Sequence, residues 1–184
     1  ARHPEALRQI VLADRIVLTK LDLRGPLDSQ EEVRLRALNP VAEVVSVADI
    51  EADPGRLFAP VAVARPDTGE SGHAHHTHGI HAWSIPIDRP ATRAGLAAFA
   101  AALGHALGPA LLRCKGVVRT ARGPVLIQGV GARFSFEDAD RLAASIEPHV
   151  TCIVQGCDRG AVAALLPWLH VPEGTLPPAP EELP

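Results

Sequence analysis

The chain has 184 residues, 47% of them hydrophobic and 21% charged, and its formal net charge at pH 7 is −3. This length suits one domain or slightly more, and the apolar fraction is sufficient for a buried core. The small net charge, without any block of like charges, argues against a nucleic-acid partner or an anionic membrane surface. No apolar run approaches the roughly 20 residues of a membrane span, so we expect no membrane partner.

Three cysteines at irregular spacing predict a reducing, cytoplasmic environment. Cys114 and Cys152 lie in apolar strand patterns and are expected in the core, whereas Cys157 lies in a glycine-containing turn and is expected nearer the surface. Arg113 and Lys115 are expected at a solvated strand edge. The sequence contains no methionine, even at position 1, which indicates a piece of a longer chain.

The first third of the chain alternates between helical and strand patterns. A helix is predicted over residues 4–13, a strand over 15–18, a helix over 28–38 and a strand over 41–47. Asp28 is placed to cap the second helix, with Glu31 three residues on as in a capping box, and Asn39 and Pro40 end it. The strand–helix–strand order predicts a parallel pair joined by a right-handed crossover.

After residue 54 the composition shifts toward Pro, Gly, Asp and Arg, which predicts a linker of a length uncommon inside one compact domain. The pattern then restarts, with strands predicted over 82–87, 111–119, 125–130, 132–136 and 150–155, and helices over 92–107, 137–146 and 158–166. This order indicates an α+β layer with a largely antiparallel sheet. The tail from residue 172, rich in proline and glutamate, is expected to be disordered.

The segment SGHAHHTHGIH, residues 71–81, holds five of the nine histidines of the chain. We predict that these five bind metal: His73, His75, His76, His78 and His81. Neutral imidazole is the commonest ligand for zinc and similar metals such as cobalt. The spacing does not fit a structural zinc module, in which cysteines also contribute, so loading and unloading of metal is favoured. The competing interpretation is a solvated polar loop that binds metal only in vitro.

The predicted strand over 15–18 ends in Thr19, Lys20, Leu21 and Asp22. This sequence resembles the N/T-K-x-D motif with which GTPases bind guanine. In that motif the carboxylate accepts hydrogen bonds from the ring N–H and the exocyclic amine of guanine, a donor pair that adenine lacks. Solvated turn residues after a strand are the competing interpretation. The strand–motif–helix–strand context favours the guanine site, and Ser46, at the end of the next strand, lies where GTPases have a second guanine-contacting loop.

Several segments occur in the order typical of the CobW family, P-loop GTPases linked to cobalt and zinc delivery. They are QIVLADRIVLTKLDL, LRALNPVAEVV, the histidine run, SIPIDRP, and LLRCKGVV followed by PVLIQGV. The resemblance implies that residues 1–60 are an α/β remnant of the P-loop GTPase domain, 61–81 a His-rich linker, 82–168 the CobW C-terminal domain and 169–184 a tail. It also implies guanine nucleotide as ligand, with a client metalloprotein or a cobalamin-pathway enzyme as partner.

Two family motifs are missing from this sequence. It contains no G-x-x-x-x-G-K-S/T phosphate loop and no CxCC metal motif. We therefore expect no GTP hydrolysis by the chain alone, and binding of GTP and Mg²⁺ only with a P-loop half; no catalytic residue is predicted. The alternatives to a GTP-dependent metallochaperone are a non-enzymatic module that buffers metal and docks on a protein, and a plain structural domain.

Overall fold

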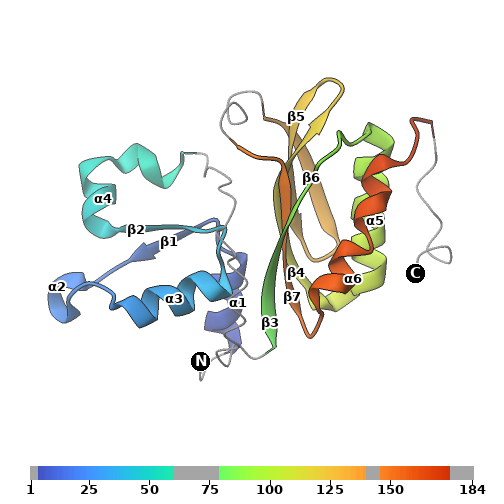
Figure 1. The fold of residues 1–184 in the computed structure, drawn as a ribbon. Coiled ribbons are helices and arrows are strands. Elements are labelled where there is room, and N and C mark those ends of the chain that lie inside the picture. The colour runs from blue at the N-terminus through green and yellow to red at the C-terminus, as the bar shows by residue number, and fades with distance from the viewer. Residues whose placement is uncertain (1–3, 60–78, 140–145, 175–184) are drawn as a thin grey trace.

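The computed structural model describes residues 4–59, 79–139 and 146–174. An N-terminal part made of short helices and two strands lies against a five-stranded sheet, which carries further helices on its opposite face (Figure 1). None of the helices within these ranges is both long and apolar enough to cross a membrane.

The N-terminal part contains the predicted parallel pair of strands. Its elements are α1 (Pro4–Leu12), β1 (Arg15–Leu18), α2 (Leu21–Arg24), α3 (Ser29–Leu38), β2 (Glu43–Ser46), α4 (Val47–Ala52) and the 3₁₀ helix η1 (Pro54–Leu57). Strand β1 pairs with β2 so that Leu18 lies opposite Ser46. The prediction of parallel strands is confirmed, and the carboxyl ends of both strands lie at one edge of the small sheet.

Capping boxes start two of these helices. The Asp28 carboxylate accepts from Glu31 N at 2.8 Å, and the Glu31 carboxylate accepts from Asp28 N at 3.0 Å, as predicted. Ser46 and Asp49 form a second box that the prediction missed. Because this box starts α4 at Val47, β2 ends at Ser46, and the predicted strand over 41–47 is too long at its carboxyl end.

The second part is a sheet with the order β3-β7-β4-β5-β6, and all four pairings are antiparallel. Its elements are β3 (Ile80–Pro86), α5 (Arg93–Leu107), η2 (Gly108–Ala110), β4 (Leu111–Thr120), β5 (Gly123–Val130), β6 (Arg133–Asp138), β7 (His149–Gln155), α6 (Arg159–Ala163) and η4 (Leu166–His170). The predicted antiparallel α+β layer is confirmed. The predicted helix over 137–146 is wrong at its start, because β6 continues to Asp138, which pairs with Val125; residues 140–145 lie outside the described ranges.

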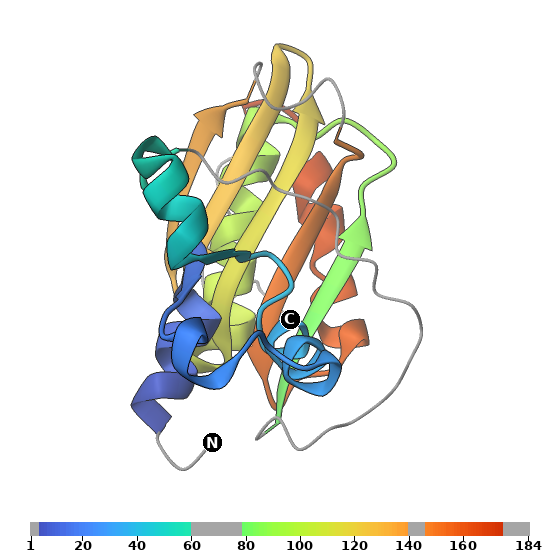
Figure 2. The ribbon, with the colours of Figure 1, turned by 90° about the vertical axis from the view of Figure 1, so that its left-hand side faces the viewer.

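The sheet is covered on both faces. On one face, α5, α6 and η4 bury a core that includes Phe99, Leu103, Cys114 and Cys152, so the predicted burial of both cysteines is confirmed. On the other face the N-terminal part packs through a smaller apolar cluster. Its buried members are Leu7, Val11, Val41, Ile80 and Ile153. Figure 2 shows the molecule from this side, with the N-terminal part in front of the sheet.

Gly95 is a point of close approach between α5 and η4. A Cβ atom at Gly95 would lie 2.0 Å from the carbonyl oxygen of Leu169. We expect Gly95→Ala to lower the free energy of unfolding by about 2 kcal/mol or more, since backbone must move to admit the methyl group. Gly104→Ala, on the same helix, is the matched control.

At Gly104 the added Cβ would be 3.5 Å from the Cβ of Ala132, an ordinary contact. Alanine is also the better helix former by about 0.8–1 kcal/mol, so Gly104→Ala should stabilise the chain. Urea unfolding of both variants measures the two changes. Equal effects of the two substitutions would contradict the close approach at Gly95.

Candidate functional site

The residues of the predicted guanine motif follow directly on β1. Thr19 and Lys20 are exposed after Leu18, and Asp22 is exposed in the first turn of α2. Since Leu18 lies opposite Ser46, the motif and the start of α4 lie at the same strand edge. Ligands of open parallel sheets bind outside the carboxyl ends of the strands, so this edge is the candidate nucleotide site.

Lys20 has a left-handed backbone, with φ 58° and ψ 30°, and is the one non-glycine residue with positive φ in the described ranges. That conformation costs a non-glycine residue roughly 1–2 kcal/mol. Such strain is concentrated at functional sites, where the surrounding structure has to maintain it. Here the turn at Lys20 ends β1 abruptly and brings Asp22 into the following helical turn.

The side chains of Thr19, Lys20 and Asp22 make no hydrogen bond or ion pair to any residue that the structure describes. Their hydroxyl, ammonium and carboxylate groups are therefore available to a ligand. An exposed carboxylate can accept two parallel hydrogen bonds from a donor pair. This is the chemistry that recognition of guanine requires.

Ser46 differs from these residues, because its hydroxyl and its N–H are already hydrogen-bonded within the chain. Its hydroxyl donates to the Asp49 carboxylate at 2.7 Å and accepts from Asp49 N at 3.1 Å, and its N–H donates to the same carboxylate at 2.8 Å. The hydroxyl bond and then the N–H bond lower the pKa of Asp49 below its ordinary value. Ser46 therefore holds the start of α4 at the strand edge.

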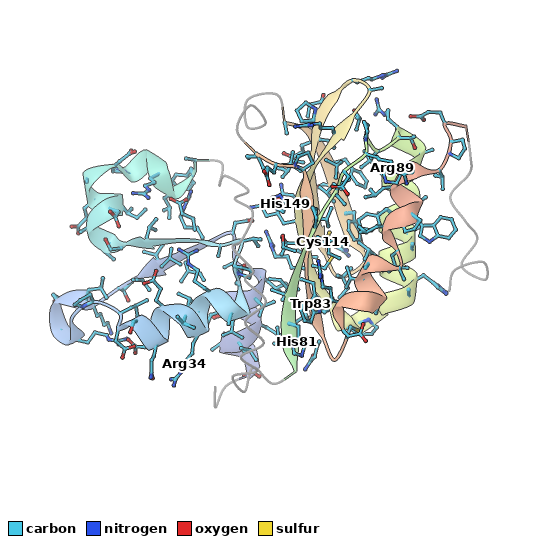
Figure 3. The ribbon with its side chains drawn as sticks, in the orientation of Figure 1. Arg34, His81, Trp83, Arg89, Cys114 and His149 are labelled. Carbon is cyan, nitrogen blue, oxygen red and sulfur yellow. The ribbon has the colours of Figure 1, made fainter. Side chains whose placement is uncertain are left out.

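Of the five predicted metal ligands, only His81 falls within the described residues; His73, His75, His76 and His78 lie outside them. His81 is in β3 and stacks on Trp83, with 5.5 Å between ring centroids and 10° between ring planes (Figure 3). Trp83 packs against the core on the α5 side of the sheet and donates from Nε1 to Cys157 O at 3.1 Å. His81 thus belongs to β3, and its ring lies with that of Trp83 on the α5 side of the sheet.

No three residues among His, Cys, Asp and Glu come together in the described ranges in a way that could hold a metal ion.

The sequence interpretation missed an ion cluster between the two parts, in which two buried cations share one half-exposed carboxylate. Arg113 and Lys115, on β4, are 4% and 2% exposed, and both contact Oδ1 of Asp14, which precedes β1. Lys115 Nζ lies 2.9 Å from that oxygen, and Arg113 Nη1 also donates to Leu12 O at 2.7 Å. The expected solvated strand edge is wrong, because β4 is the central strand and the N-terminal part covers this face.

The pKa of Asp14 reflects this cluster. Burial by itself would raise it, but the hydrogen bond and charge of Lys115, together with Arg113, outweigh burial and lower the pKa below its ordinary value. Arg113 and Lys115 alternate with buried Cys114 along β4, and this alternation was the available signal for a polar group on the opposite face. The partner itself, 99 residues away from Arg113, has no signal in the sequence.

Residues 80–167 match the family model of the cobalamin synthesis protein cobW C-terminal domain. The fold resembles Zn(II)-bound YjiA GTPase from E. coli, with a TM-score of 0.68 and 22% identity, and a Zn(II)-bound triple mutant of YjiA GTPase, with a TM-score of 0.66 and 23% identity. Each match covers 92% of this chain and 56% of the YjiA chain, so the present chain spans little more than half of that length. Comparison with curated proteins gave no match.

Proposed function

Since residues 80–167 belong to the C-terminal domain family of the cobalamin synthesis protein CobW, we propose that the chain is the C-terminal part of a GTP-dependent zinc or cobalt chaperone. In this proposal residues 1–60 are the last part of a CobW-type GTPase domain, and the histidine run carries the metal. The client is a metalloprotein or a cobalamin-pathway enzyme. The fold likeness to a Zn(II)-bound GTPase over 92% of the chain supports it.

The observation that carries the proposal is the strand edge at which the guanine motif and the start of α4 meet. Asp22 accepts from the ring N–H and the exocyclic amine of guanine, while the stem of Lys20 lies along the plane of the base. The absence of competing bonds on either side chain within the described residues supports these roles. Ser46 contributes by fixing the start of α4 through its capping box.

The phosphates of GTP need groups that this sequence does not contain. A phosphate loop offers backbone N–H groups, a lysine and a magnesium-binding hydroxyl, and no such motif occurs in the 184 residues. The chain alone should therefore recognise the base weakly, with a dissociation constant on the order of 1 mM, equivalent to about −4 kcal/mol. It should not turn GTP over.

The test is a nuclear magnetic resonance titration of the chain with GDP and, separately, with ADP. GDP is expected to shift the amide signals of residues 19–22 and 46–48, and ADP is expected to leave them unchanged. Asp22→Ala should abolish the GDP response, because it removes the acceptor for both guanine donors. Asp88→Ala is the matched control, since Asp88 is an exposed aspartate outside this edge.

Equal shifts with GDP and ADP would contradict the proposed guanine site. They would favour the alternative, a module that buffers metal and docks on a protein. GTP hydrolysis by the purified chain at the rate of an ordinary G protein would show that the missing phosphate loop is not required.

A further inference from the structure

An open groove of about 300 Å³ lies where the N-terminal part faces the hairpin of β5 and β6. It is lined by Asp14 and Arg113 and by residues 128–130 and 133–135. The volume is at the lower end of the range for small-molecule sites, roughly 300–1,000 Å³. Asp14 precedes β1 and Thr19 follows it, so the groove and the guanine motif lie at opposite ends of this strand.

The charges beside the groove are not balanced. Arg113 and Lys115 are almost fully buried, and both use the same oxygen of one carboxylate, Asp14. No second carboxylate pairs with either cation among the described residues, and Arg113 Nε has no hydrogen-bond partner there. Buried charges are ordinarily paired, because an unpaired one loses its hydration without compensation. The excess positive charge therefore favours an anion at this place.

The rim of the groove adds hydrogen-bond donors. Arg133 is exposed at the start of β6 and forms no ion pair within the described ranges, so its guanidinium can bind an oxyanion through two parallel bonds. Ser135 and Gln128 add a hydroxyl and an amide. Glu137 accepts from Gln128 Nε2 at 3.4 Å. Even when this carboxylate is counted, the described residues at the groove contribute three cations and two anions.

We propose that this groove binds the carboxylate or phosphate group of a small anionic ligand. Arg133 contacts the oxyanion directly, Ser135 and Gln128 donate to it, and Arg113 and Lys115 supply positive charge from beneath. This site goes beyond the proposed nucleotide and metal functions and needs neither of them.

The test is calorimetric titration of the 184-residue chain with inorganic phosphate and with succinate at low ionic strength, against sodium chloride as a blank. Arg133→Gln is expected to weaken binding at least about tenfold, because it removes a charge-assisted bidentate contact. Arg122→Gln is the matched control: Arg122 is also exposed but lies in the turn between β4 and β5, outside the groove. It should leave the affinity unchanged.

The two probes distinguish the sources of the oxyanion, since tighter phosphate binding indicates a phosphorylated ligand and tighter succinate binding a carboxylate. Circular dichroism spectra of both variants should match the unsubstituted chain, as both arginines are exposed. The proposal is overturned if neither probe binds, or if Arg133→Gln binds both as tightly as the unsubstituted chain. It is overturned as well if Arg122→Gln weakens binding equally, because the attraction is then a general effect of surface charge.

Discussion

Replacing Asp14 with alanine is expected to lower the free energy of unfolding by about 3 kcal/mol, near the lower end of the range for breaking a buried ion pair. The substitution leaves Arg113 and Lys115, at 4% and 2% exposure, without a carboxylate between the two parts of the chain. The Asp14 side chain is itself 49% exposed, so water can partly replace it, and the upper end of the range is not expected.

Urea unfolding measures this loss, and Asp88→Ala, an exposed aspartate on the other part, is the control. Asp14→Asn keeps the shape and removes only the charge, so it separates electrostatics from packing. If Asp14→Ala and Asp88→Ala unfold at the same urea concentration, the cluster does not hold the two parts together.

The contribution of Asp14 should also depend on pH. Because the pKa of Asp14 is lowered in the folded chain, its stabilisation is fully present above the ordinary aspartate value of about 3.9 and is lost as the pH falls through the folded value. The difference in unfolding free energy between Asp14→Ala and the unsubstituted chain should therefore be constant at neutral pH and shrink below about pH 4. A difference that grows on acidification would contradict this assignment.

If the run binds metal as proposed, changing all five of its histidines to alanine is expected to lower the affinity for zinc or cobalt at least about tenfold, because the change removes the proposed imidazole ligands. The positions are His73, His75, His76, His78 and His81. The affinity of the unsubstituted chain for zinc or cobalt should fall as the pH drops through about 6.5, because free imidazole then takes up a proton and no longer binds metal.

Titration calorimetry with zinc measures this effect, and His105→Ala, which removes an exposed histidine outside the run, is the control. His81→Ala tests the one proposed ligand that lies within the described residues. Since His81 stacks on Trp83, metal binding at His81 should change the fluorescence of Trp83. Equal zinc affinity in the five-alanine variant and the unsubstituted chain would leave the histidines without a metal role.

Elements that depend on neighbouring residues were predictable from the sequence. The capping box of Asp28 and Glu31 determines where α3 begins, and the apolar run before Thr19 determines β1. The antiparallel strands of the second half and the helix that stops before Gly108 also follow from short-range patterns. The predicted guanine motif is also local, which is why its position at a strand edge could be inferred before the fold was known.

Features that depend on distant partners were decided by the tertiary structure. Asn39, expected only to end a helix, is fully buried, and its Nδ2 donates to the carbonyls of Ile10, Val11 and Ala13. The burial of Arg113 and Lys115 depends on a carboxylate about 100 residues earlier in the chain, and the groove forms only where that carboxylate meets β5 and β6. Short-range spacing carries no information about such pairs, because their energy arises only once the sheet and the N-terminal part have packed together.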